Sequence, residues 1–324
     1  MRVGATARPS FPGRRGRAWL LGTALLLGLP AQAFLGRLEF TADDHFAGAT
    51  LRRGIQATEE QCPSAGAAAV WANVSPRLGE CIKYWSAGLS ESTGRVVLFL
   101  HGDYYQERPE SHERLSGEKL SADAAAWSRR LRAPYIHLGR PGTHGSSGDH
   151  RRRRTSDESL IVSKALDALK QRHGITEFVV AGQSGGGHLT ASLLTLRDDI
   201  VCAVPTSAPS SPRIRYLKLG RTRDVTNFDS YEPVQHLKAN PVHERLRVFI
   251  LGDPADSNVF WESQVVLAEP LKERGIEHAI VEGAAVGPER HGLNNSARTL
   301  AGLCFHDRGM DEIREHLRIR RIKG

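Results

Sequence analysis

The chain has 324 residues, of which 40% are hydrophobic, enough for one large domain with its own core. Its formal net charge is +8, but five arginines and no acidic residue lie in the first 33 positions, which leaves +3 for residues 34–324. A net charge this small gives no reason to expect a nucleic-acid partner, and we expect none.

The first 33 residues have the features of a secretory signal. A basic region precedes the apolar residues 19–29, a stretch of about a dozen residues that is too short to span a bilayer as a helix. Ala31-Gln-Ala33 then offers a cleavage site. We expect export to the periplasm or beyond, cleavage before Phe34, and no stable membrane insertion afterwards. An uncleaved anchor and twin-arginine export through Arg14-Arg15 are the alternatives.

Strand and helix patterns alternate along the rest of the chain. Residues 34–80 are of mixed composition and predict a cap or edge strands, and residues 207–246 a possible lid over the site. The remaining patterns predict strands at 81–89, 95–100, 134–138, 177–181, 200–205, 247–251 and 277–281, and helices at 120–131, 159–171, 188–196, 260–274 and from 294. This alternation favours a single α/β domain over 34–324, with a mostly parallel sheet and helices on both faces.

Four cysteines become candidates for disulfides if the chain is exported, and four cysteines allow three pairings. Cys62 and Cys81 are close in sequence and flank a loop. Cys202 lies in a predicted strand and Cys304 in the last predicted helix. We therefore favour the pairs Cys62–Cys81 and Cys202–Cys304, with a buried free thiol as the alternative for Cys202. No spacing resembles a zinc site, so no metal is expected.

The most informative motif is Gly182-Gln-Ser-Gly-Gly186. A short apolar run precedes it and a helical pattern follows, which is the arrangement of a nucleophile elbow, a strained strand–turn–helix that exposes a serine. Gly182 and Gly186 are expected because a side chain at either position would clash with the neighbouring strand or helix. The motif alone is weak in a glycine-rich chain. With its flanks, it predicts Ser184 as a catalytic nucleophile.

A serine nucleophile needs an acid and a histidine, which in this layout follow it in that order along the chain. Two aspartates, Asp253 and Asp256, follow the strand expected at 247–251. We prefer Asp256, because Asp253 lies beside a proline and can act as a turn former. His291 follows the strand expected at 277–281 and is our candidate base. His278 begins that strand, at the wrong end of the sheet, and His188 lies one helical turn beyond the serine, where it would support the site instead.

An oxyanion hole requires backbone N–H donors beside the nucleophile. One should come from Gly185. The other should come from the loop after the strand at 95–100, where His101-Gly102-Asp103 follows, and Asp103 is the preferred donor. Tyr104 could add a hydroxyl. The alternative is an ordinary buried histidine beside a turn glycine.

These motifs together resemble α/β-hydrolases, and within them the prolyl-oligopeptidase-like serine hydrolases. The resemblance rests on residues 99–102, 140–150, 182–186, 252–259 and His291, and covers roughly residues 80–310. It also favours Asp256, because the acid in such enzymes commonly lies three residues before a valine, here Val259. It implies hydrolysis of an ester or peptide bond in a small molecule or short peptide, without a cofactor. Residues 34–80 are too few for the β-propeller of full prolyl oligopeptidases, so a stand-alone hydrolase domain is expected.

Two charged or polar segments allow a second interpretation. The Gly/Ser-rich loop 140–150 could bind phosphate, but we favour a tight loop beside the elbow, in which Arg140 either orders the site or meets a substrate carboxylate. The run Arg151 to Arg154 could form an anionic-surface patch. We favour a solvated helix start countered by Asp157 and Glu158.

The residues leave two questions of function open. They do not separate a carboxylesterase from an exopeptidase, since residues 207–246 carry both acidic and apolar groups. A catalytically inactive binding protein on the same fold is the alternative from another class.

Overall fold

A computed structural model describes residues 36–40, 46–224, 229–313 and 315, all of which belong to one compact unit, Gly36–Gly324. The expected signal at 1–33 and its cleavage site lie outside the described residues. Within the described part of the chain, no helix is long and apolar enough to cross a membrane.

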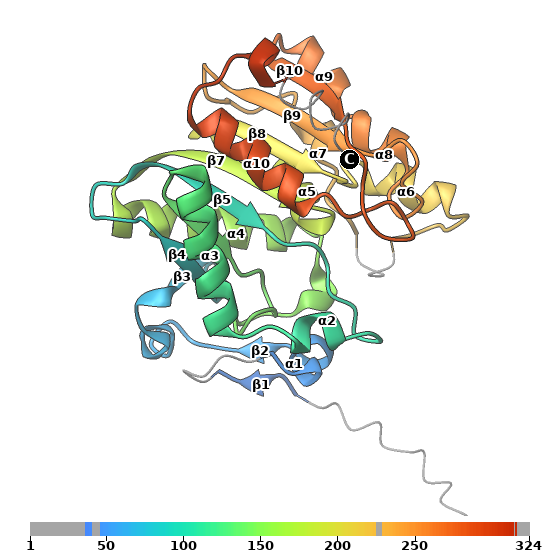
Figure 1. Ribbon diagram of the computed structural model, residues 1–324. Helices are drawn as coiled ribbons and strands as arrows, with labels where there is room; N and C mark the ends of the chain where they lie inside the picture. Colours follow the sequence, from blue (N-terminus) through green and yellow to red (C-terminus); the bar gives the residue numbers. More distant parts are fainter. Residues whose placement is uncertain (1–35, 41–45, 225–228, 314, 316–324) are drawn as a thin grey trace, which may run out of the picture. The chain divides into compact units, whose positions relative to one another are not determined.

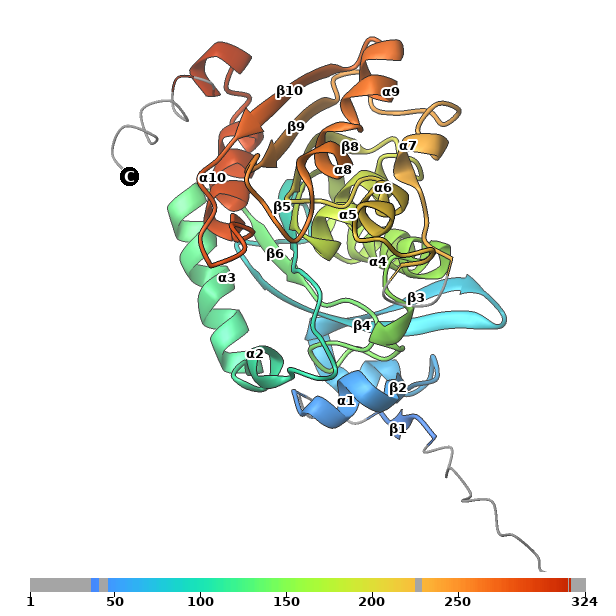
Figure 2. The same ribbon diagram turned by 90° about the vertical axis from the view of Figure 1, so that its right-hand side faces the viewer.

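The centre of the unit is an eight-stranded sheet (Figures 1 and 2). Its strand order is β10-β9-β8-β7-β5-β6-β4-β3. All neighbours from β10 to β6 run parallel, whereas β4 and β3 pair antiparallel at one edge. The expectation of a mostly parallel sheet is confirmed. The strands are β3 (Ala69–Ser75), β4 (Leu78–Ala87), β5 (Gly94–Leu100), β6 (Tyr135–Leu138), β7 (Ile175–Gln183), β8 (Ile200–Thr206), β9 (Arg247–Gly252) and β10 (Glu277–Glu282).

Helices cover both faces of the sheet and create a core on each. On β5, Val96 and Leu98 belong to one core and Val97 and Phe99 to the other, because successive strand side chains point to opposite faces. The first core is closed by α4 (Ser156–His173), α5 (Gly185–Leu193) and α9 (Ala268–Glu273), and the second by α3 (Gly117–Leu131) and α10 (Asn294–Phe305). Figure 1 shows α3 and α10 together on one side of the sheet.

Helix α4 shows how local sequence sets the limits of an element. The hydroxyl of Thr155 accepts a hydrogen bond from the amide of Glu158 and caps the N-terminus, and Gly174 ends the helix in a left-handed conformation with φ 58°. The helix therefore extends three residues beyond the predicted 159–171 on its N-terminal side and two on its C-terminal side.

The described N-terminal segment before β3 packs beside the antiparallel edge of the main sheet. Strands β1 (Leu38–Glu39) and β2 (Ile55–Gln56) pair in a separate parallel sheet, with α1 (Gly48–Arg53) between them and the 3-10 helix η1 (Cys62–Ala68) after them. Ile55 exchanges two backbone hydrogen bonds, of 2.9 and 2.7 Å, with Gly148. The segment is thereby joined to the loop 140–150.

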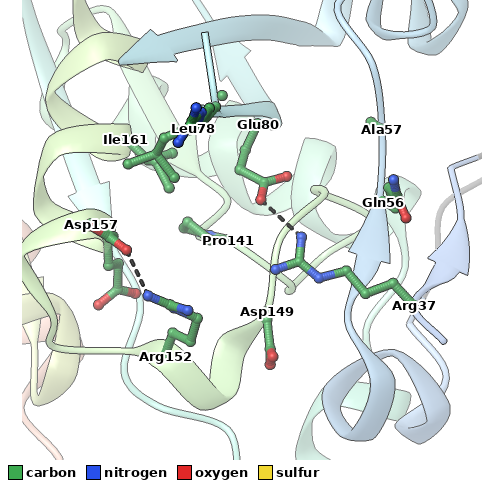
Figure 3. A pocket seen from close by; sticks show the side chains of 13 residues that line it. Arg37, Gln56, Ala57, Leu78, Glu80, Pro141, Asp149, Arg152, Asp157 and Ile161 are labelled. Atoms are coloured by element: carbon green, nitrogen blue, oxygen red, sulfur yellow. Dashed lines mark hydrogen bonds and ion pairs between the residues drawn. The ribbon is translucent and has the colours of Figure 1, made fainter. Parts of the chain in front are cut away.

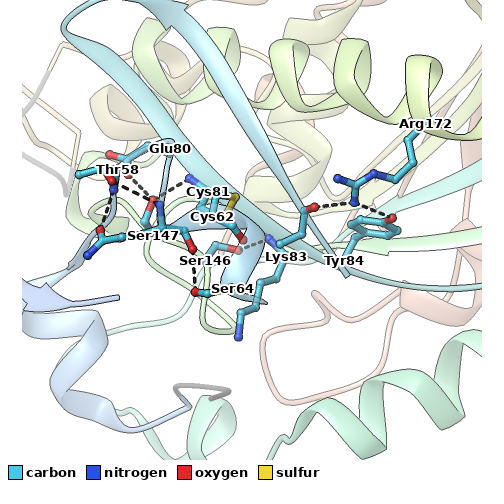
Figure 4. The surroundings of a disulfide bond; sticks show 12 residues. Thr58, Cys62, Ser64, Glu80, Cys81, Lys83, Tyr84, Ser146, Ser147 and Arg172 are labelled. Atoms are coloured by element: carbon cyan, nitrogen blue, oxygen red, sulfur yellow. Dashed lines mark hydrogen bonds between the residues drawn. A yellow bond between two sulfur atoms is a disulfide. The ribbon is translucent and has the colours of Figure 1, made fainter. Parts of the chain in front are cut away.

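Both expected disulfides are present in the structure. Cys62–Cys81 joins η1 to β4, beside buried side chains that include Glu80 and Ser147 (Figure 4). Cys202–Cys304 joins β8 to α10, across 102 residues of sequence. The structure describes no free cysteine.

The prediction of one continuous helix at 260–274 is wrong. The structure divides it into α8 (Trp261–Val265) and α9, because Pro270 has no N–H to donate to the carbonyl of Val266. Shorter helices complete the fold. They are α2 (Glu110–Glu113), η2 (His150–Arg152), α6 (Pro212–Lys218) and α7 (Pro233–His236), the last two within the possible lid.

Candidate active site

Ser184 lies on a sharp turn between β7 and α5. Its backbone has φ 58° and ψ −118°, a strained conformation for a residue with a side chain. A Cβ added to Gly182 would lie 2.1 Å from the carbonyl oxygen of Gly186, and one added to Gly186 would lie 2.1 Å from that of Leu100. Both glycines are therefore required by close backbone approach, as the motif predicts.

The loop after β5 meets the elbow at Gly185. A Cβ on Gly185 would lie 1.8 Å from Oδ1 of Asp103, so that only glycine fits beside this carboxylate. Among the backbone hydrogen bonds of the described residues, none uses the amide N–H of Gly185 or of Asp103. Both amides are therefore available as donors at the N-terminus of α5, where the helix dipole favours negative charge.

His291 and Asp256 form a hydrogen-bonded pair. Nδ1 of His291 lies 2.7 Å from Oδ2 of Asp256. The other carboxylate oxygen of Asp256 accepts hydrogen bonds of 2.9 Å from the amides of Asn258 and Val259, and the side chain is fully buried. A buried, doubly accepting carboxylate fixes the ring so that Nε2 is the nitrogen left for proton transfer. No hydrogen bond joins Ser184 Oγ to His291 in the described structure.

The rival aspartate has other partners. Asp253 accepts from the amides of Ala255 and Ala285 and from Arg290, all at 2.7–2.9 Å. Burial acts to raise the pKa of Asp253, but these hydrogen bonds outweigh it and lower the pKa. This carboxylate therefore holds the loop before His291 and does not contact the imidazole.

The two rival histidines also have other partners. His278 Nδ1 lies 2.8 Å from the carbonyl oxygen of Ile276, at the start of β10. His188 is buried in α5, where Nε2 lies 2.8 Å from the carbonyl oxygen of Tyr231. Burial lowers the pKa of His188 to about 3, so its ring is neutral at neutral pH.

Gln183 is a positioning residue that the sequence did not single out. Its amide group donates a 2.6 Å hydrogen bond to the carbonyl oxygen of His291 and accepts one of 3.1 Å from the amide of Leu293. The residue before the nucleophile thus holds the loop of the candidate base from both sides. Its place inside the G-x-S-x-G motif was the only signal, and the motif leaves that position unrestricted.

Asp103 is held by arginines, which corrects the interpretation of the run 151–154. Its side chain is buried, Oδ1 lies 2.9 Å from Nη1 of Arg140, and Oδ2 pairs with Arg154. Arg154 also binds both oxygens of Asp224 at 2.9 Å, and Arg140 binds Glu158. Only the first half of the run, Arg151 and Arg152, is a solvated helix start.

The burial of Arg153 and Arg154 has a physical cause. Three carboxylates, on Asp103, Glu158 and Asp224, are taken out of water in this region, and charges in that position persist only with partners. Arg153 lies 3.4 Å from Asp103 Oδ2, and burial lowers its pKa. Arg140 is fully enclosed by these contacts, which supports the ordering role expected for it and leaves it no face toward a substrate.

Buried histidines pack beneath the same loop. His101 lies between the carbonyl of Gly102 and the hydroxyl of Thr143, at 2.7 and 3.1 Å. The hydroxyl of Tyr104 points to Nε2 of His144 at 3.0 Å. Burial lowers the pKa of each buried histidine in this region, so the cluster is neutral at neutral pH. Its members are His101, His112, His137, His144 and His150.

A cavity of about 580 Å³ connects these groups. Ser184, His291, Gly102 and Asp103 all line it, together with side chains from α3 and α10. No described residue of 207–246 lines it, so the lid remains a prediction. Among the described residues, no three His, Cys, Asp or Glu side chains are arranged to hold a metal ion.

A second cavity, of about 490 Å³, lies between the loop 140–150, β4 and the start of α4 (Figure 3). Its charged lining consists of three arginines and four carboxylates, several of which pair with each other, as Arg37 does with Glu80 and Arg152 with Asp157. A phosphate would meet more carboxylates than arginines here. The structure therefore gives no support to the phosphate interpretation.

The strand order, the parallel centre, the helices on both faces and the serine at the turn after β7 define an α/β-hydrolase fold. No family model and no curated protein sequence matches the chain.

Solved structures with a similar fold include peptidase and esterase chains. The acylaminoacyl peptidase of Pyrococcus horikoshii is 15% identical with a TM-score of 0.49, and the match covers 74% of this chain and 40% of the peptidase. An esterase of Pyrococcus furiosus is also 15% identical with a TM-score of 0.49, covering 75% of this chain and 90% of the esterase. The protein Est1E of Butyrivibrio proteoclasticus is 14% identical with a TM-score of 0.47, covering 75% and 99%. The chain thus spans about 40% of the peptidase it matches.

Proposed function

We propose that the protein is an exported serine hydrolase that cleaves an ester or peptide bond through an acyl-enzyme. Ser184 attacks the acyl carbon, His291 takes its proton and passes it to the leaving group, and Asp256 fixes the imidazole. Water then releases the acyl group with the same histidine as base. The observation that supports this proposal best is that Ser184 and His291 line one cavity, while His291 is hydrogen-bonded to the buried Asp256 at 2.7 Å.

The negative charge of the tetrahedral intermediate is assigned to two backbone amides. Gly185 N–H and Asp103 N–H make no backbone hydrogen bond in the described structure, and both residues lie beside the serine, as does Gly102. The carboxylate of Asp103 would oppose an adjacent oxyanion. The arginines paired with it offset that repulsion, so the backbone of Asp103 can act while its side chain is neutralised.

Export is supported by the two disulfides, because such bonds persist in oxidising compartments. The substrate is a small ester or a short peptide, and the cavity lining does not favour one over the other. A carboxylesterase and an exopeptidase therefore remain two forms of the same proposal, to be separated by comparing short acyl esters with aminoacyl and dipeptidyl nitroanilides.

A fluorophosphonate probe tests the proposal directly. It should modify Ser184 in the native protein, and Ser184→Ala should abolish labelling and lower the hydrolysis of p-nitrophenyl acetate at least about a thousandfold. Ser210→Ala is a matched control, since Ser210 is a buried serine outside the cavity. An unmodified Ser184 would favour a catalytically inactive binding protein instead.

A further inference from the structure

The loop 140–150 is folded tightly back on itself. Gly142 has φ 73°, and a Cβ at this position would lie 2.4 Å from the backbone nitrogen of His150. The amide of Gly142 also donates a 2.9 Å hydrogen bond to the carbonyl oxygen of Ser147. The turn therefore brings the two ends of the loop, with Arg140 and His150, close together.

Side chains of this loop contact residues 101–104, which we call the oxyanion loop. Three of these contacts are made to side chains. They are Arg140 to Asp103 at 2.9 Å, Thr143 to His101 at 3.1 Å and His144 to Tyr104 at 3.0 Å. The fourth contact is made to the backbone, because the amide N–H of Tyr104 donates a 3.2 Å hydrogen bond to Nε2 of His150.

The bond to His150 restrains Asp103 from its C-terminal side. On the other side, the carbonyl oxygen of Gly102 lies 2.7 Å from Nδ1 of His101. Each peptide unit is planar, and one hydrogen bond leaves such a plane free to tilt about that bond. Because the two planes share the Cα of Asp103, the second bond, from Tyr104 to His150, removes this freedom. Together the two imidazoles fix the direction of Asp103 N–H.

His150 accepts the hydrogen bond through a neutral ring. Nε2 must be unprotonated to accept an N–H, which places the ring proton on Nδ1. Burial lowers the pKa of His150 well below its usual value, and the positive charges of Arg140 and Arg153 lower it further. The acceptor is therefore present at neutral pH without any proton transfer.

His150 lies behind the oxyanion loop, away from the cavity. Gly102, Asp103 and Tyr104 line the cavity beside Ser184, whereas His150 is not among its lining residues. A substrate in the cavity therefore meets the oxyanion loop and not this ring. An effect of His150 on the reaction must pass through the backbone that it holds.

We propose that His150 is a positioning residue for the oxyanion hole, which aims the N–H of Asp103 by accepting the N–H of Tyr104. The loop 140–150 then has a function of its own, as a brace that holds the oxyanion loop from behind. This inference rests on the proposed serine hydrolase, whose reaction it does not alter.

Three variants separate the acceptor from the bulk of the ring. His150→Gln keeps an acceptor oxygen near the place of Nε2, His150→Asn carries the same amide on a side chain one methylene shorter, and His150→Leu has no acceptor. With p-nitrophenyl acetate, the Asn and Leu variants should lose at least about tenfold in kcat with KM within about threefold. The Gln variant should keep kcat within about threefold of native.

A matched control is available on α4. His173 is a partly buried histidine whose Nε2 lies 2.8 Å from the hydroxyl of Tyr84, outside the cavity. His173→Leu also removes a ring and its hydrogen bond, but it should leave kcat unchanged.

A transition-state mimic reports the oxyanion hole directly. A trifluoromethyl ketone adds to a serine oxygen and forms a tetrahedral adduct, whose oxyanion occupies the position of the reacting oxygen. In the Asn and Leu variants its affinity should fall in proportion to kcat. A role confined to folding would lower Tm without this proportional loss and would contradict the proposal.

The outcomes separate this inference from the proposed function. Equal kcat values for the Gln and Leu variants, a loss expressed in KM alone, or a Gln variant that does not fold would overturn the inference. If the Leu variant does not fold, the comparison of Gln with Asn decides. Ser184-dependent hydrolysis that all three variants retain in full overturns the inference alone. Native protein that is as inactive as Ser184→Ala and does not bind the ketone overturns the proposed function, and the inference with it.

Discussion

The side-chain amide of Gln183 donates a 2.6 Å hydrogen bond to the carbonyl oxygen of His291, across 108 residues of sequence. Because Ser184 directly follows Gln183, one residue sets the position of the candidate nucleophile and of the loop that carries the candidate base. This buried side chain, which also accepts from the amide of Leu293, thus helps to set the distance between the two reacting groups.

Replacing Gln183 with alanine should lower kcat about a hundredfold with little change in KM, because a displacement of about 1 Å in a catalytic group has that effect. The rate of fluorophosphonate labelling should fall in parallel. Gln235→Ala, on the exposed surface of α7, is the control. A kcat for Gln183→Ala within about twofold of native would show that the loop is held by other contacts.

Replacement of either of the two aspartates after β9 should have a different effect, on catalysis for Asp256 and on stability for Asp253. Asp256→Asn should reduce kcat by about ten-thousandfold while the fold is kept, because the amide favours the wrong tautomer of His291. Asp253→Asn should leave kcat within about tenfold but lower the midpoint of urea unfolding, because its bond to Arg290 is weakened. Steady-state kinetics and urea titration of both variants check this, and the reverse pattern would exchange the two roles.

The arginine run offers a comparison within four residues. Arg154→Ala should lower the free energy of unfolding by about 3–5 kcal/mol, because it removes the guanidinium that pairs with the buried carboxylates of Asp103 and Asp224. Arg151→Ala removes only an exposed pair with Asp149 and should cost less than about 1 kcal/mol. Denaturant unfolding measures both, and similar small losses would argue against the buried network.

Acid should destabilise the protein through its buried histidines. Burial lowers the pKa of His112 from 6.5 to about 4, so the unfolded chain binds more protons than the folded protein between these values. Its contribution is fully kept above pH 6.5 and is lost as the pH falls toward 4. We expect the free energy of unfolding to be nearly constant just above this window and to decline within it.

Urea titrations over this pH range measure the decline. His112→Phe should reduce its slope by up to about 1.4 kcal/mol per pH unit. His236→Phe alters an exposed histidine and serves as the comparison. A slope unaffected by His112→Phe would mean that this ring is not a source of the acid sensitivity.

The sequence could predict the order of strands and helices and the close packing at the elbow. Short-range patterns carry these features: an apolar strand, a glycine where backbones touch, and a helical period. Pro270 shows the limit of that reading, because the apolar period continues through it while its missing N–H separates α8 from α9. The disulfides could be paired because four cysteines leave few choices.

Only the tertiary structure decided which polar residues are buried, and with which partners. Arg153 and Arg154 read as surface charges beside Asp157, yet they lie against Asp103, about fifty positions earlier in the chain. Gln183 lies inside the G-x-S-x-G motif, but the motif leaves its position unrestricted. Its role arises where the end of β7 meets the loop before α10, and burial there requires the polar atoms of its side chain to find partners. That requirement comes from neighbours distant in the sequence, which a local pattern cannot specify.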